Sequence, residues 1–147
     1  MLTVKKIYFD MDGTIANLYG VEGWLDDLNA HNPRPYAMAK PMVNMQALAR
    51  RLNNLQRAGY EVCVISWLSK TSTREYDELV TKAKLEWLAK HLASVQFDEI
   101  HIVAYGTPKS TLGKGILFDD ELRNRQDWGE GAYLPEEIFE ILGGLAK

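Results

Sequence analysis

Two pairs of acidic residues each follow a short apolar run of the sequence. Asp10 and Asp12 follow the first run, and Asp119 and Asp120 follow the last one. Carboxylates that lie this close together repel one another and titrate at high pH unless a cation holds them ionised. An all-oxygen ligand set favours a hard ion such as Mg²⁺, which keeps several waters and also binds substrate phosphate. If the fold gathers these acids, we expect a magnesium site.

The same residue types suit phosphoryl transfer. A carboxylate can attack phosphorus to form an aspartyl-phosphate, which splits one hard displacement into two. A second acid two residues further on, as Asp12 is from Asp10, can protonate the leaving oxygen and then activate water. Ser66 and Lys109 offer a hydroxyl and an ammonium group that would hold the charged equatorial oxygens. Gly13 permits the close backbone approach that such a loop needs.

These side chains can meet only if parallel strands carry them to one edge of a sheet. Apolar and β-branched runs predict strands at Val4–Phe9, Glu61–Ile65, Ile100–Ala104 and Gly115–Phe118. Helical spacing and capping signals predict helices at Asn44–Ala58, from a capping box at Ser72–Glu75 to about Leu92, and from Leu134 onward. Such alternation implies crossovers and a parallel sheet covered on both faces. We therefore predict a doubly wound α/β fold, whose ligand crevice lies outside the carboxyl ends of the strands.

About 30 residues between Thr14 and Asn44 do not follow this alternation, and loops of that length usually serve as lids or are disordered. Trp24 and its apolar neighbours, Leu25 and Leu28, indicate a small ordered helical insert instead. We expect a loop at 32–35. Trp24 either stacks on a base of the substrate or packs between insert and core, and the same two alternatives hold for Trp67.

The composition narrows the class of protein. A chain of 147 residues fits one domain with its own core. Its net charge is −3, from 17 basic and 20 acidic residues, which disfavours a nucleic-acid partner. Cys63 is the only cysteine and cannot form an internal disulfide. No run approaches the roughly 18 apolar residues of a membrane span, so we expect no membrane partner and a cytoplasmic protein.

Four segments together resemble a known family. Phe9-Asp10-Met11-Asp12-Gly13-Thr14 is similar to the first motif of the haloacid dehalogenase superfamily of hydrolases. Val64–Ser66 resembles its second motif, Pro108-Lys109 its third and Ile116–Asp120 its fourth. The resemblance implies a Rossmann-like core, here a single domain over residues 1–147 with a minimal cap insert at about 16–43.

The resemblance also implies roles for these residues. Asp10 would be the nucleophile and a magnesium ligand, and Asp12 the general acid/base that also binds the metal through its backbone carbonyl. Asp119 would be a further metal ligand, with Asp120 as a ligand or as support for the metal. The groups that would bind the substrate phosphate are Ser66, Lys109 and Thr14, although Thr14 is equally suited to building the turn.

The insert and the Phe118-Asp119-Asp120-Glu121 segment are similar to the 5'(3')-deoxyribonucleotidase branch of the superfamily. An aspartate at position 12 indicates hydrolysis of a phosphate ester rather than dehalogenation. The expected function is a magnesium-dependent phosphomonoester hydrolase that acts through an aspartyl-phosphate. Its expected substrate is a nucleoside monophosphate or a similar small phosphorylated metabolite, and a homodimer is an open alternative to a monomer.

Three alternatives stay open at this point. A small insert leaves the site open, which would admit a phosphate on a nucleic-acid end or on a protein. A non-enzymatic, phosphorylation-responsive module would use similar residues, but there the paired acids follow the first strand rather than the last. Lys114 competes with Lys109 as the phosphate-binding lysine. We favour Lys109 because Lys114 directly precedes a predicted strand, away from the crevice.

Overall fold

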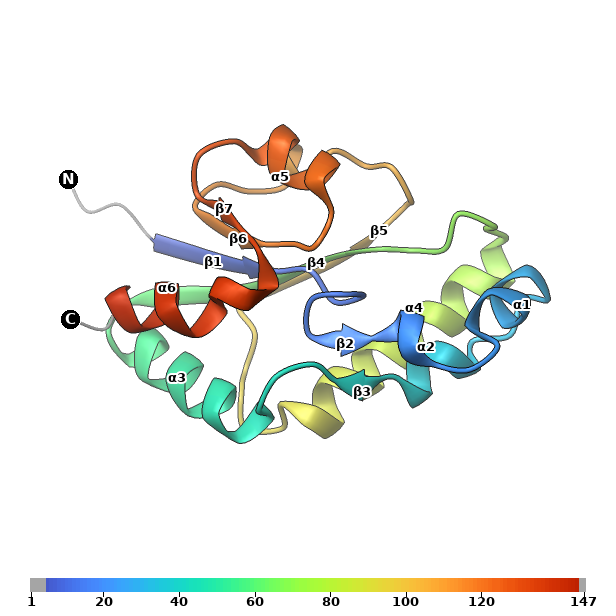
Figure 1. Cartoon of the computed structure of the whole chain (residues 1–147), viewed down its shortest axis with the longest axis horizontal. Helices are drawn as coiled ribbons and strands as arrows, with labels where there is room; N and C mark the ends of the chain where they lie inside the picture. The colour runs from blue at the N-terminus through green and yellow to red at the C-terminus, as the bar shows by residue number, and fades with distance from the viewer. Residues whose placement is uncertain (1–4, 146–147) are drawn as a thin grey trace.

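Five parallel strands form one sheet at the centre of the molecule (Figure 1). The computed structural model describes residues 5–145, so Val4 of the first predicted strand lies outside the described residues. The strand order is β5-β4-β1-β6-β7, and every neighbouring pair is parallel. In chain order the elements are β1 (Lys5–Phe9), β2 (Ala16–Asn17), η1 (Leu18–Gly20), α1 (Trp24–Asn29), α2 (Arg34–Met38), β3 (Lys40–Pro41), α3 (Met45–Arg57), β4 (Tyr60–Trp67), α4 (Arg74–His91), β5 (Glu99–Val103), η2 (Lys109–Thr111), β6 (Ile116–Phe118), α5 (Leu122–Trp128), β7 (Ala132–Tyr133), η3 (Pro135–Glu137) and α6 (Ile138–Leu145).

Helices cover both faces of the sheet, as alternation along β1 shows. Ile7 and Phe9 point into the larger core, which α3, α4 and α6 close. Tyr8 points to the opposite face, where Trp128 of α5 packs edge-on against its ring. Figure 1 shows α3 and α6 on one side of the sheet and α5 on the other. The predicted doubly wound α/β fold is confirmed.

The four predicted strands form at the predicted places, and so do the three predicted helices. The prediction of a capping box at Ser72–Glu75 is wrong, however. Thr73 caps α4, since its side chain accepts a hydrogen bond from the backbone N–H of Tyr76. The Ser72 hydroxyl instead donates to the Asp77 carboxylate.

Two elements near the carboxyl end of the chain have no counterpart in the sequence prediction. Helix α5 spans Leu122–Trp128, a segment for which the sequence predicted neither a helix nor a strand. Asn124 is the one residue of α5 that is fully buried, so the helix has no apolar periodicity to reveal it. Strand β7 has two residues, too few for a pattern.

The insert after β1 is ordered and helical, as the sequence predicted. Trp24 and Leu28 lie in α1. The prediction of a loop at 32–35 is wrong, because α2 begins at Arg34 and has a proline in its first turn. The Arg34 guanidinium binds Asp27 and so joins α2 to α1. Strands β2 and β3 pair antiparallel at the base of the insert. Within residues 5–145, no helix is both long enough and apolar enough to cross a membrane.

Candidate active site

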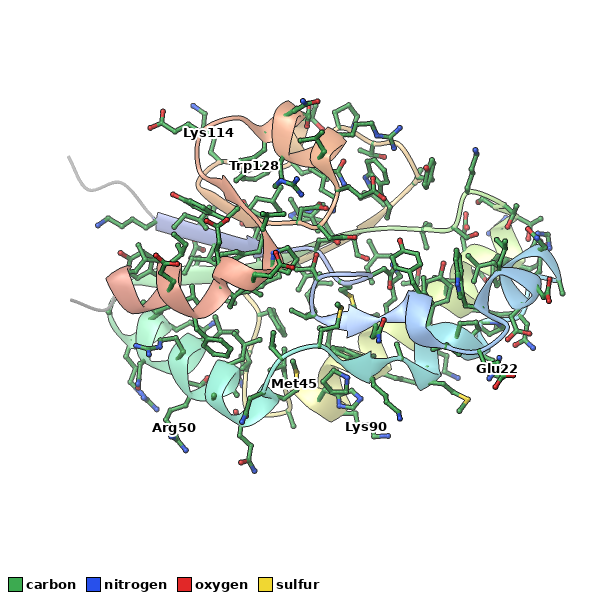
Figure 2. The ribbon with its side chains drawn as sticks, viewed as in Figure 1. Glu22, Met45, Arg50, Lys90, Lys114 and Trp128 are labelled. Atoms are coloured by element: carbon green, nitrogen blue, oxygen red, sulfur yellow. The ribbon has the colours of Figure 1, made fainter. Side chains whose placement is uncertain are left out.

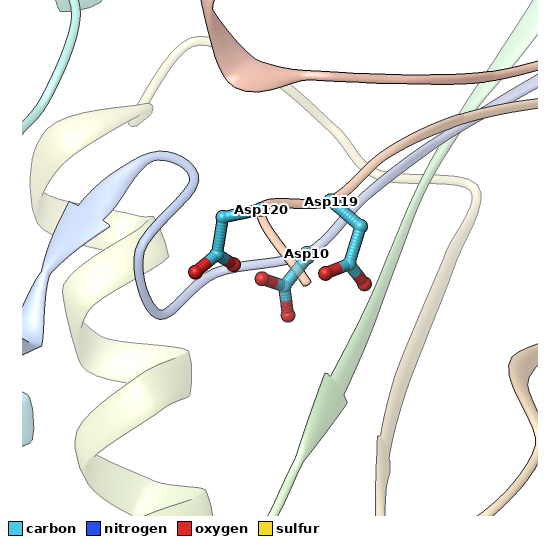
Figure 3. Close-up of side chains that lie close together, drawn as sticks. All are labelled: Asp10, Asp119 and Asp120. Atoms are coloured by element: carbon cyan, nitrogen blue, oxygen red, sulfur yellow. The ribbon is translucent and has the colours of Figure 1, made fainter. Parts of the chain in front are cut away.

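The central strands carry two acids to the same point. Phe9 of β1 and Phe118 of β6 are partners in the sheet, so Asp10 and Asp119 leave it side by side. The backbone N–H of Asp10 donates to the Phe118 carbonyl at 3.0 Å. Figure 3 shows Asp10, Asp119 and Asp120 facing one another, and each offers an oxygen within 4.8 Å of the others. We refer to these three residues as the acid cluster.

The turn after β1 closes onto the acid cluster. Gly13 has a φ of +83°, and a Cβ at this position would collide with the Asp120 carboxylate. The buried Thr14 hydroxyl lies 2.9 Å from Asp10 Oδ2 and 3.3 Å from Asp120 Oδ1, and it accepts from the Asp120 N–H at 3.2 Å. The turn therefore fixes the relative positions of two acids of the cluster.

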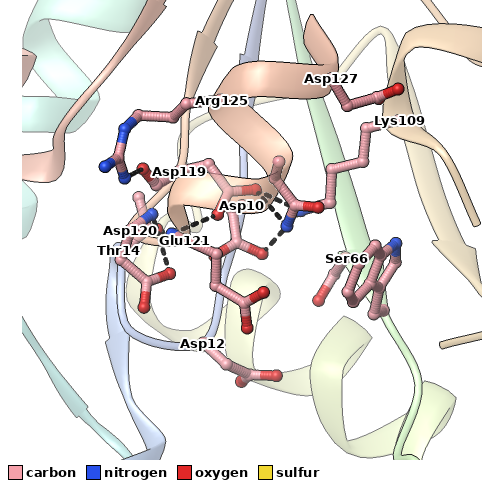
Figure 4. A network of polar contacts seen from close by, with 12 residues as sticks. Asp10, Asp12, Thr14, Ser66, Lys109, Asp119, Asp120, Glu121, Arg125 and Asp127 are labelled. Atoms are coloured by element: carbon pink, nitrogen blue, oxygen red, sulfur yellow. Dashed lines mark hydrogen bonds and ion pairs between the residues drawn. The ribbon is translucent and has the colours of Figure 1, made fainter. Parts of the chain in front are cut away.

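Asp119 is fully buried, and three donors hold its carboxylate (Figure 4). The backbone N–H of Glu121 lies 2.9 Å from Oδ1, while the Asn124 amide and the Lys109 ammonium lie 3.1 and 2.7 Å from Oδ2. Arg125 donates to the Asp119 carbonyl at 3.0 Å. Helix α5, which the sequence did not predict, therefore supplies two residues that bind Asp119, namely Asn124 and Arg125.

Lys109 is the cation inside the acid cluster. Its side chain is 1% exposed, and its ammonium lies 2.9 Å from Asp10 Oδ1 as well as beside Asp119. Lys114 instead lies with Lys5 and Lys6 at the opposite end of the strands (Figure 2). The structure therefore brings Lys109 to the predicted site and leaves Lys114 outside it.

Asp12 and Ser66 also approach the cluster, but a lysine that the sequence analysis missed binds them. The Lys84 ammonium lies 2.9 Å from Asp12 Oδ2, 2.5 Å from Ser66 Oγ and 2.7 Å from the Trp67 carbonyl. Burial raises the pKa of Asp12, and the Lys84 charge opposes that rise. The sequence held one signal for this contact: Lys84 follows Val80 by four residues, and this spacing places both on the same buried face of α4.

Burial and repulsion together disfavour charge in the acid cluster. Burial raises the pKa of Asp119 to about 6 and the pKa of Asp120 to about 8, and the negative charge of Asp10 adds to both. Burial opposes the charged form of Lys109, but the two carboxylates beside it outweigh burial and raise the pKa of this lysine. One ammonium cannot balance three carboxylates, so the donor set fits a divalent, oxygen-binding cation.

A pocket of about 300 Å³ opens above the acids. Its floor includes Asp10, Asp12 and Lys109, and the insert forms one wall. Much of the remaining lining is aromatic, from Tyr19, Trp24, Tyr36, Trp67 and Tyr105. Trp67 and Tyr105 lie with ring centroids 5.0 Å apart, as do Tyr19 and Trp24. Trp24 and Trp67, for each of which the sequence left stacking on a base and packing between insert and core as alternatives, therefore both line the pocket.

The comparisons with known proteins agree with this architecture. No family model and no curated protein sequence matches the chain. Its fold is similar to a D,D-heptose 1,7-bisphosphate phosphatase from Burkholderia thailandensis, with 16% identity, a TM-score of 0.53 and 88% and 90% of the two chains covered. It is also similar to the same enzyme from B. bronchiseptica, complexed with magnesium and phosphate, with 15% identity, a TM-score of 0.59 and 97% and 98% covered. The chain therefore has the fold of these two enzymes.

Proposed function

We propose that the chain is a magnesium-dependent phosphomonoester hydrolase of the haloacid dehalogenase type, with Asp10 as its nucleophile. The observation that carries this proposal is the meeting of the acid cluster and Lys109 at the floor of a pocket. The two similar solved structures named above are phosphatases, and one of them is complexed with magnesium and phosphate.

The carboxylates of Asp10 and Asp119 would hold the magnesium ion, with Asp120 beside them and the backbone carbonyl of Asp12 as a further ligand. When bound, the ion would neutralise charge on the phosphate and on the carboxylates. The raised pKa values of Asp119 and Asp120 support this assignment, because the charge of a divalent cation would offset the burial and the repulsion that raise them.

Asp10 would make the nucleophilic attack. Thr14 donates to its Oδ2 and Lys109 to its Oδ1, so the carboxylate is held in one orientation at the pocket floor. An Asp10 oxygen would form a bond to phosphorus while the bond to the leaving oxygen breaks, which gives an aspartyl-phosphate and an alcohol. Attack of water on phosphorus then breaks the aspartyl bond and releases inorganic phosphate.

Asp12 and Ser66 would complete the reaction. Asp12 would give a proton to the leaving oxygen in the first step and take one from water in the second. Lys84 has only donors, so the Ser66 oxygen must accept from it, which leaves the Ser66 hydroxyl proton for a phosphate oxygen. Lys109 supplies a further positive charge to the phosphate.

The substrate we propose is a nucleoside monophosphate or a similar small ester with a flat leaving group. Aromatic side chains on both walls of the pocket support this, since aromatic faces stack on bases. Residues 16–43 would act as a minimal cap within a single domain, and Trp24 of this cap would contact the base. The substrate of the two solved phosphatases, a sugar bisphosphate, is the first compound to compare.

Hydrolysis of 4-nitrophenyl phosphate with Mg²⁺ tests the reaction. We expect turnover that EDTA removes, and we expect Asp10→Asn to abolish it because an amide cannot replace the nucleophilic carboxylate. Asp26→Asn is the matched control, since Asp26 is exposed and lies outside the pocket lining. Undiminished turnover in Asp10→Asn would refute the mechanism.

A screen of phosphate esters tests the substrate. We expect nucleoside monophosphates to be hydrolysed with higher kcat/KM than sugar phosphates or D,D-heptose 1,7-bisphosphate. Oligonucleotides with a 3'- or 5'-phosphate test the open-site alternative, and preference for them would refute the mononucleotide assignment while leaving the reaction intact.

A further inference from the structure

We infer that Lys84 is a positioning residue that holds Asp12 in place for proton transfer, an inference that rests on the proposed function. Lys84 lies in α4, and its side chain is 1% exposed. It contacts Asp12 from the turn after β1 and Ser66 and Trp67 from β4. Among residues 5–145, Lys84 is the one lysine that forms an ion pair with Asp12.

Burial of this lysine is unfavourable unless its charge is matched. A lysine inside a protein pays a large desolvation penalty, and its three N–H donors must each find an acceptor. Here a carboxylate, a hydroxyl and a carbonyl oxygen supply the three, and the ammonium also lies 5.1 Å from the ring centre of Tyr36. Val80 and Leu88 flank Lys84 at four-residue spacing on the buried stripe of α4, where an apolar side chain would pack without this penalty. Because all three donors of the ammonium have acceptors, we infer that the charge of Lys84 has a specific role in the site.

The role of Lys84 follows from which acids each of the two buried lysines binds. Lys109 binds Asp10 and Asp119, while Lys84 binds Asp12. The acid cluster does not include the Asp12 side chain, whose Oδ2 is held on the side of β4. Ser66 and Trp67 anchor the ammonium to β4, so the position of the Asp12 carboxyl is fixed relative to this strand as well as by its own turn.

Lys84→Met tests the inference, because methionine keeps the length of the side chain and removes its donors. A leaving group that departs readily needs no proton, whereas an alkoxide does. We expect kcat for an alkyl phosphate or a nucleoside monophosphate to fall about 100-fold, in the range of general acid catalysis, with KM changed less than about threefold. With 2,4-dinitrophenyl phosphate we expect a burst of dinitrophenol, because phosphoenzyme still forms but Asp12 activates water poorly.

Two comparisons separate positioning from loss of structure. Lys90→Met removes an exposed lysine from the same helix and should behave as wild type (Figure 2). Asp12→Asn/Lys84→Met removes both charges, so no acid is left buried without its partner. If Lys84 acts through Asp12, this double variant forms phosphoenzyme from dinitrophenyl phosphate within about threefold of the rate of Asp12→Asn.

The results decide the inference in each case. Wild-type kcat on alkyl phosphates in Lys84→Met would overturn the inference. It would also be overturned if the effect of the double substitution equalled the product of the two separate effects. If Lys84→Met does not fold, the comparison of the double variant with Asp12→Asn decides instead. Wild-type protein without activity would overturn the proposed function together with the inference. An active wild type with an unaffected Lys84→Met would overturn the inference alone.

Discussion

Gly13→Ala should weaken magnesium binding through a single methyl group. Gly13 has a φ of +83°, and an alanine Cβ would lie 2.7 Å from the Asp120 carboxyl carbon, well inside van der Waals contact. Asp120 belongs to the acid cluster, so its carboxylate would have to leave the position from which it faces Asp10 and Asp119. The substitution therefore perturbs the geometry of the proposed metal site without removing a charge.

The expected magnitude has two parts. A left-handed backbone conformation costs an alanine about 1–2 kcal/mol relative to glycine. Displacement of a group that supports a metal typically weakens affinity about 10- to 100-fold, or about 1.4–2.7 kcal/mol. Gly59→Ala isolates the first part, because Gly59 has a φ of +101° and no atom lies within 4 Å of the place that an added methyl group would take.

Urea unfolding in EDTA measures the backbone part, and calorimetric titration with MgCl₂ measures the affinity. We expect both variants to lose stability without metal, by at least about 1 kcal/mol. Only Gly13→Ala should bind Mg²⁺ more weakly, with the affinity of Gly59→Ala equal to that of wild type. Wild-type affinity in Gly13→Ala would refute the assignment of Asp120 to the metal site.

Two further predictions concern the acids and the cap. The raised pKa values of Asp119, about 6, and Asp120, about 8, mean that the metal-free folded state binds protons more tightly than the unfolded state, so the contribution of these acids to stability is lost as the pH rises through those values. Mg²⁺ competes with these protons, so the rise in melting temperature on adding Mg²⁺ should be larger at pH 8.5 than at pH 5.5 in scanning fluorimetry, and equal shifts would contradict this. Trp24→Ala should raise KM for nucleoside monophosphates about 10-fold, because stacking contributes about 1–3 kcal/mol per base, and should leave KM for a sugar phosphate unchanged. Equal effects on both substrates in steady-state kinetics would argue against stacking by Trp24.

The sequence alone was sufficient for the fold class and for the acids at the strand ends. Apolar runs at regular spacing predict strands and helices because burial follows the local period of the chain, and β1, β4, β5, β6, α3, α4 and α6 form where that spacing lies. Asp10 and Asp119 were predictable partners because parallel strands deliver their following residues to one edge of the sheet. Local signals of this kind do not depend on the rest of the chain.

Other features depend on contacts between segments that are far apart in the sequence. The sequence of α5 carries no apolar stripe, so its helix and the contact of Asn124 with Asp119 depend on the surface it packs against. Lys84 lies 72 positions from Asp12, and nothing in the spacing of either residue pairs them. The aromatic pocket likewise combines Trp24 of the insert with Trp67 and Tyr105 at the ends of two strands.

The residues of the proposed reaction were thus readable from local pattern, whereas their pairing was not. Four acids follow two apolar runs in the sequence, but only the structure separates Asp12, bound to Lys84, from the acid cluster, bound to Lys109. The physical reason is that the strength of a charge interaction depends on distance and burial. Distance and burial between segments far apart in sequence are set by tertiary packing and have no local signature.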